Sequence, residues 1–131
     1  MRRLPFLILL LVLAAALSAP AAETVRRFAL VVGANRGGDD RPELKYAVSD
    51  ARRFATVLRS LGGVDEPDAL VLEQPSLHDL EKAFETLTRR TGEPRRKGGA
   101  APATRSELVF YYSGHADEKG LLLGEDRYSY R

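Results

Sequence analysis

The sequence has 131 residues, with 20 lysines and arginines against 18 acidic residues and no cysteine. This length suits one small domain. The lack of cysteine excludes disulfides, cysteine metal clusters and a thiol nucleophile among these residues. Only two histidines are present, His78 and His115, which argues against a multi-histidine zinc site. We therefore expect no cofactor and no metal.

The first residues have the pattern of a leader sequence. Met1-Arg2-Arg3 is positively charged, Phe6 to Leu17 is almost wholly apolar, and small residues follow from Ser18 to Ala22. This pattern predicts a secretory signal peptide over residues 1–22 and export to the periplasm or the cell exterior. An uncleaved anchor is the less favoured alternative, because a spanning helix needs roughly 18 to 20 apolar residues. Without the two leader arginines, 18 basic residues face 18 acidic ones, so charge does not favour nucleic acid or a membrane as partner.

A short apolar run, Phe28 to Val32, predicts a buried first strand, and a glycine-rich loop follows it from Gly33. The loop partly matches the glycine turn of short-chain dehydrogenases. Asn35 and Asp39, however, stand where that pattern requires glycine. An unrelated nucleotide-binding α/β domain is therefore kept only as a disfavoured alternative.

From Leu44 to Leu61 apolar residues recur every three or four positions, which predicts a helix that ends at Gly62-Gly63. Asp50 lies near the amino end of this helix. Taken alone, it is explained by the helix dipole or by an i,i+3 pair with Arg53.

Asp68 to Leu72 predicts a second strand, and a second helix is expected to begin after Ser76, its N-cap, with Asp79 three residues further on. His78 falls in the first turn of that helix, away from its apolar stripe, and is expected to be a surface residue. The segment from Arg89 to Arg105 contains glycines, prolines and a basic run, and predicts a solvated connector.

The third apolar run, Leu108 to Tyr112, predicts a strand covered on both faces. Gly114 allows a sharp turn, and His115 then lies at the carboxyl end of the strand, where reacting groups collect in open parallel sheets. On position alone, a structural histidine that caps the strand is the alternative. Gly120 to Gly124 brackets three leucines and predicts a short strand or hairpin arm.

Strands and helices thus alternate along the chain, which predicts an α/β fold with a mainly parallel sheet and helices on its faces. Three strands leave a sheet edge unpaired, and complete domains avoid long apolar edges. We therefore expect residues 23–131 to be the N-terminal part of a larger domain.

Four elements together resemble the caspase-like cysteine peptidases, in particular the bacterial relatives of caspases and metacaspases. They are the strand that ends at Val32-Gly33, the helix start Ser49-Asp50-Ala51, the strand end Tyr111 to His115, and the Gly120 to Gly124 hairpin. The resemblance covers Phe28 to about Tyr130. It implies the N-terminal portion of the caspase-like three-layer sandwich.

The resemblance also implies roles for three residues. His115 matches the histidine of the Cys-His dyad, which assists thiolate attack and protonates the leaving amine. Ala116 stands where the family usually has glycine, and its backbone N–H matches an oxyanion donor. Asp50 matches an acid that lines the S1 pocket in metacaspase-like members, which implies Arg or Lys at the cleavage site of a peptide or protein substrate.

The family's nucleophile lies at the end of the next parallel strand, which is not among these residues. We therefore expect a caspase-like cysteine endopeptidase of which this 131-residue chain, alone, is inactive. The alternative is a non-catalytic caspase-like module for binding or assembly. Calcium activation is possible in relatives, but nothing in this sequence supports it.

Overall fold

The computed structural model describes residues 24–93 and 105–131. In chain order the elements are β1 (Val25–Gly33), α2 (Ala47–Ser60), β2 (Val64–Glu73), α3 (Leu77–Thr91), β3 (Arg105–Ser113), β4 (Ala116–Asp117), β5 (Gly120–Leu123) and β6 (Asp126–Ser129). The predicted leader and most of the predicted connector lie outside the described residues. Neither helix in the described part is long and apolar enough to cross a membrane.

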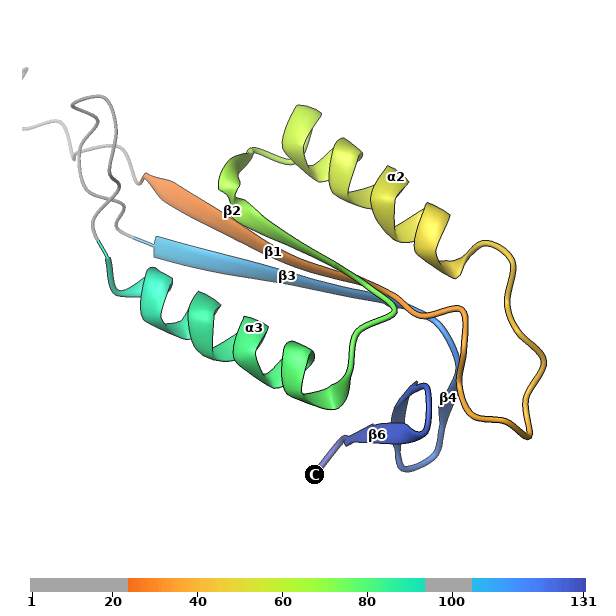
Figure 1. Ribbon diagram of the computed structural model, residues 1–131. Helices are drawn as coiled ribbons and strands as arrows, with labels where there is room; N and C mark the ends of the chain where they lie inside the picture. Colours follow the sequence, from red (N-terminus) through yellow and green to blue (C-terminus); the bar gives the residue numbers. More distant parts are fainter. Residues whose placement is uncertain (1–23, 94–104) are drawn as a thin grey trace, which may run out of the picture.

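The main sheet is parallel, with strand order β2-β1-β3 (Figure 1). Its central strand, β1, is the most deeply buried, and Phe28 to Val32 have no exposed surface. The last residue of β1, Gly33, pairs with Glu73 of β2 and with Ser113 of β3. All three strands therefore end at one edge, called here the carboxyl edge.

One helix covers each face of this sheet, so the predicted three-layer α/β sandwich is confirmed (Figure 1). Successive β1 side chains point to opposite faces, as strand geometry requires. Ala29 and Val31 pack on the α2 side, whereas Phe28, Leu30 and Val32 pack on the α3 side.

The α2 face is built from small residues. The helix buries Ala47, Ala51 and Ala55, and a Cβ added at Gly33 would lie 2.6 Å from the Cα of Val48. The helix therefore approaches the carboxyl edge as closely as two backbones allow. The prediction that Leu61 belongs to the apolar face of this helix was wrong. Leu61 is the C-cap and its exposed fraction is 84%.

The predicted start of α3 is confirmed. The Ser76 hydroxyl accepts a hydrogen bond from the Asp79 N–H at 3.2 Å, and the Asp79 carboxylate accepts one from the Ser76 N–H at 3.0 Å. This reciprocal capping box satisfies two of the free N–H groups at the helix start. His78 is exposed, as predicted. The helix continues to Thr91, so the connector begins later than the predicted Arg89.

A buried ion pair joins β1, β2 and the end of α3 at the other end of the sheet. Nε and Nη2 of Arg26 each donate to the Asp68 carboxylate at 2.7 Å, and the Asp68 side chain is 3% exposed. Nη1 of Arg26 also donates to the Glu93 carbonyl at 2.8 Å. The hydrogen bonds to Asp68 raise the pKa of Arg26 above its usual value.

The prediction that β3 is covered on both faces was wrong. β3 is an edge strand in the described sheet, and Leu108 and Phe110 are 47% and 40% exposed. The last part of β3 packs more closely: the Tyr111 ring stacks on Phe54 with centroids 4.2 Å apart, and Tyr112 joins the α3-side core. Phe110, although partly exposed, still contacts Phe84, with ring centroids 5.3 Å apart. An apolar run has the same composition in a central strand as in an edge strand, and so it did not distinguish them.

The predicted hairpin is present as a small antiparallel sheet of order β4-β5-β6, which lies at the carboxyl edge (Figure 1). Leu121, Leu122 and Leu123 are buried, and Leu123 joins the α3-side core. Tyr128 of β6 stacks on Phe84 of α3 with centroids 5.6 Å apart. These contacts fix the hairpin against α3, directly after His115.

Candidate functional site

The loops that follow β1 and β3 lie side by side at the carboxyl edge. The N–H of Ala34 donates to the Ser113 carbonyl at 2.8 Å, which extends the pairing of the two strands by one residue. Gly114 then turns the chain where no side chain fits, since an added Cβ would collide with the Tyr112 hydroxyl and approach the Ala34 carbonyl to 3.0 Å. This turn places His115 against the loop that follows β1 (residues 34–46), called here the β1 loop.

The imidazole of His115 is held by a backbone carbonyl from that loop. Its Nε2 lies 2.8 Å from the carbonyl oxygen of Pro42, 73 residues away in sequence. A carbonyl oxygen can only accept, so Nε2 carries the proton. In the neutral ring the lone pair is therefore on Nδ1, which is the nitrogen available to take a proton.

The β1 loop also packs against the ring. Gly37 is buried, and a Cβ added there would lie 2.5 Å from the Cβ of His115 and 2.7 Å from its Cδ2. No side chain other than hydrogen fits without moving the imidazole. The ring is therefore positioned by two contacts with one loop, van der Waals contact at Gly37 and a hydrogen bond at Pro42.

Tyr112 holds the backbone of the same turn. Its hydroxyl lies 2.8 Å from the His115 carbonyl and 2.6 Å from the Leu122 carbonyl, and its one proton serves one of them at a time. The Leu122 N–H also donates to the His115 carbonyl at 2.9 Å. Burial raises the pKa of Tyr112 to about 12, so the hydroxyl remains a neutral donor near neutral pH.

Ala116 follows His115 directly as the first residue of β4 and is exposed. Among the non-glycine residues that the structure describes, positive φ occurs at Gln74 alone. The backbone at Ala116 therefore has a conformation that alanine adopts as readily as glycine. Its N–H belongs to the residue that follows His115 in the chain.

Asp50 lies in the first turn of α2, and its carboxylate is 46% exposed and 4.0 Å from Nη1 of Arg53. This is the i,i+3 pair that the sequence suggested as an alternative. Within the described residues, Asp50 and His115 share no hydrogen bond or ion pair. The start of α2 is nevertheless tied to the same loop, since the Asn35 Oδ1 accepts from the Val48 N–H at 3.1 Å.

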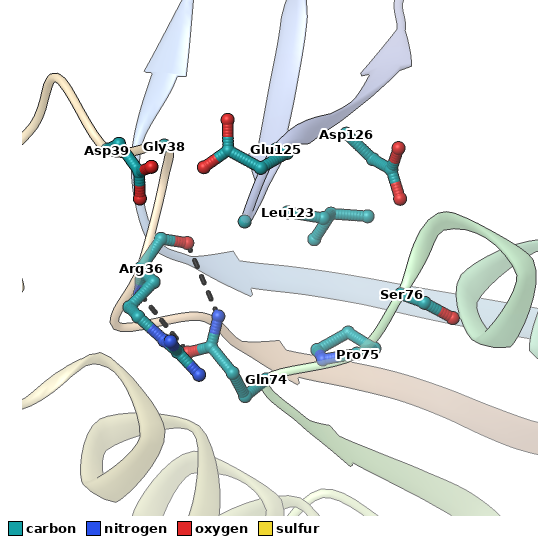
Figure 2. Close-up of a pocket in the computed structure, with 10 residues that line it drawn as sticks. Arg36, Gly38, Asp39, Gln74, Pro75, Ser76, Leu123, Glu125 and Asp126 are labelled. Carbon is teal, nitrogen blue, oxygen red and sulfur yellow. Dashed lines mark hydrogen bonds between the residues drawn. The ribbon is translucent and has the colours of Figure 1, made fainter.

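A cavity of about 410 Å³ opens beside this loop, between the β2–α3 turn and the hairpin (Figure 2). Asp39, Glu125 and Asp126 contribute carboxylates to its lining, and Arg36 contributes a guanidinium. Gly37, which lies against His115, falls in the sequence between two lining residues, Arg36 and Gly38. In the part of the chain that is described, no group of three or more acidic or histidine side chains is arranged to hold a metal ion.

A family model described as the caspase domain matches residues 26–131. The chain belongs to the caspase family. The predicted resemblance is thus confirmed, and the parallel three-stranded sheet with flanking helices is consistent with part of a caspase fold. A caspase-family chain is a peptidase by membership, which places it among the hydrolases with protein substrates. Searches of curated proteins and of solved structures found no match to this chain.

Sequence reasoning did not find Pro42, Gly37 or Tyr112, which contact His115 in this caspase domain, nor Gln74, which binds the loop that carries Gly37 and Pro42. The Gly37-Gly38 pair was a visible sign of a tight approach in the loop. Pro42 acts through its carbonyl oxygen, which every residue carries, so its side chain gave no indication of the contact.

Proposed function

We propose that this caspase-family chain carries the histidine of a cysteine-type endopeptidase, with His115 as the proton-transfer group. The observation that supports this most directly is the Nε2 contact with the Pro42 carbonyl, which leaves Nδ1 free. Nδ1 takes the proton of a cysteine thiol, and the thiolate attacks the scissile carbonyl carbon. The imidazolium then returns a proton to the leaving amine as the C–N bond breaks.

Two further roles follow from the family resemblance. The Ala116 N–H stabilises the oxyanion that forms on the attacked carbonyl, and its unstrained backbone supports this assignment. Asp50 favours Arg or Lys at the cleavage site, because a carboxylate pairs well with a guanidinium or an ammonium.

The thiol itself must come from outside the printed residues, which contain no cysteine. The 131-residue chain alone is therefore expected to hydrolyse no peptide. The second candidate is a non-catalytic caspase-like module that binds or assembles. We further propose export to the periplasm or the cell exterior, directed by residues 1–22; detection of the protein only in the cytosolic fraction would contradict this.

Reading the DNA past codon 131 separates the two candidates. An in-frame Asp-x-Cys turn within about 60 residues supports the peptidase, since this length accommodates a further parallel strand and its crossover, which takes a dozen or more residues. A stop codon supports the binding module. In the extended protein, His115→Ala should lower cleavage of an Arg or Lys reporter peptide by about 10² to 10⁴.

The matched control is His78→Ala, which removes the other histidine from an exposed position on α3 and should leave turnover unchanged. Full turnover by His115→Ala would refute the assigned role. Asp50→Asn should reduce the preference for Arg and Lys over neutral reporters. Glu85→Gln, at an exposed position on α3, is its control and should keep the preference.

A further inference from the structure

Gln74, at the turn between β2 and α3, has a backbone conformation that glutamine rarely adopts. Its φ is +47°, and no other non-glycine residue in the described part of the chain has positive φ. Such a conformation costs about 1 kcal/mol or more for a residue with a Cβ. Glycine would satisfy the backbone at lower cost, so the presence of glutamine indicates a task for its side chain.

The side chain forms three hydrogen bonds with the backbone of the β1 loop, which we call the Gln74 clamp. Figure 2 shows those with Arg36. Oε1 accepts from the N–H groups of Asn35 at 2.7 Å and Arg36 at 3.1 Å. Nε2 donates to the Arg36 carbonyl at 3.3 Å. The backbone N–H of Gln74 also donates to the Gly33 carbonyl at 2.7 Å.

The clamp joins the segments that meet at the carboxyl edge. The Arg36 carbonyl that receives the Gln74 amide also accepts from the Gly124 N–H at 3.1 Å, which connects the loop to the hairpin. One side chain from the end of β2 thus ties the start of the β1 loop to the element that follows His115. Backbone amides satisfied in this way hold the loop in a single conformation.

The last residue that the clamp binds, Arg36, directly precedes the residue that contacts the imidazole. Gly37, directly after Arg36, packs against the His115 ring, and the same loop then brings the Pro42 carbonyl to Nε2. Both contacts that orient the ring therefore depend on the path that the loop takes from Arg36. The turn at Gln74 is not needed to start α3, because Ser76 and Asp79 cap that helix themselves.

We propose that Gln74 is a positioning residue for His115, which fixes the ring orientation and the Nε2–H tautomer through the β1 loop. The catalytic meaning of this inference rests on the proposed function, because the tautomer of His115 affects peptide cleavage only if His115 transfers a proton in that reaction. The structural coupling between Gln74 and His115 does not rest on it, and it can be measured in the 131-residue chain without any thiol.

The test is ¹⁵N NMR of the two imidazoles in the 131-residue chain and its variants, near neutral pH. The unchanged chain should show His115 mainly as the Nε2–H tautomer. Gln74→Gly keeps the backbone conformation but removes the clamp, and it should lower the ratio of Nε2–H to Nδ1–H tautomers at His115 about tenfold. His78 is an internal reference whose resonances should not move.

Gln74→Glu keeps an acceptor for both N–H groups, so it should retain most of the His115 tautomer preference and serve as the conservative rescue. Should Gln74→Gly fail to fold by circular dichroism, Gln74→Asn replaces it, because asparagine tolerates positive φ and its side chain is one methylene shorter. Unchanged His115 resonances in a folded Gly or Asn variant would overturn the proposal. So would equal losses in the Gly and Glu variants.

This experiment separates the two proposals. If the peptidase assignment fails because His115→Ala retains turnover in the extended protein, the NMR result still decides whether Gln74 sets the tautomer. If Gln74→Gly leaves the tautomer intact, the role of His115 in cleavage is unaffected.

Discussion

Gly37→Ala adds one methyl group at the contact between the β1 loop and the His115 ring. The new Cβ would lie 2.5 Å from the nearest ring-side atom, whereas ordinary contacts begin at 3.4 Å, so the two groups must separate by about 0.9 Å. Because the Nε2–Pro42 distance is 2.8 Å, a shift of about 1 Å away from the loop takes the pair beyond hydrogen-bonding range. Overpacking at a loop costs about 1 kcal/mol and the lost hydrogen bond about 1 kcal/mol more.

We therefore expect Gly37→Ala to lower the free energy of unfolding by about 2 kcal/mol, which corresponds to a fall of roughly 10 °C in Tm for a domain of this size. Thermal unfolding and ¹⁵N NMR of His115 measure the two effects. Gly92→Ala is the matched control, because its added Cβ would make only an ordinary contact of 3.6 Å with the Arg89 carbonyl. A Gly37→Ala variant with the Tm and His115 resonances of the unchanged chain would refute the steric argument.

Three further predictions concern the scaffold. Asp68→Asn leaves the Arg26 charge buried without its carboxylate and should lower the free energy of unfolding, measured in urea, by about 3 kcal/mol. This is the low end for a broken buried pair, because the guanidinium keeps a carbonyl partner. A decrease below 1 kcal/mol would contradict this. Tyr112→Phe leaves carbonyls at the turn without their hydroxyl donor and should cost about 1 to 2 kcal/mol, with an unchanged midpoint as the contrary result. Hydrogen bonds from Ser76 lower the pKa of Asp79, so its contribution is complete above the ordinary pKa near 3.8 and is lost as pH falls through the lowered folded value. The stability difference between Asp79→Ala and the unchanged chain should therefore shrink from pH 6 to pH 2.5, and a difference that stays constant would exclude the carboxylate as its source.

The helices and strands could be predicted where the interactions that form them involve residues close together in sequence. The Ser76–Asp79 capping box and the apolar run from Phe28 to Val32 each act within a few residues, and the structure confirms both. The order of the strands depends on which strand pairs with two neighbours. Because β1 and β3 carry similar apolar runs, these runs do not show which of the two is central. The sequence therefore predicted a sheet but assigned to β3 a burial that belongs to β1.

The candidate site was predicted only in part, for a similar reason. His115 could be placed at a strand end, because a glycine follows an apolar run, and its proposed task came from the family resemblance. The contacts that orient its ring come from backbone atoms of Gly37 and Pro42. Gln74 acts on Asn35 across 39 residues of sequence, and nothing in the local pattern indicates this contact.

Because α2 packs so closely on the sheet, the two faces of the domain differ in how well they tolerate larger side chains. Ala51 and Ala55 have no exposed surface, and Gly33 leaves no room above the strand end, so any enlargement there must lift the helix and carry Asp50 away from the carboxyl edge. The α3 face is filled by leucines and phenylalanines, which can exchange volume with one another. Sequence libraries meant to improve stability should therefore vary the α3 face and leave the α2 face unchanged.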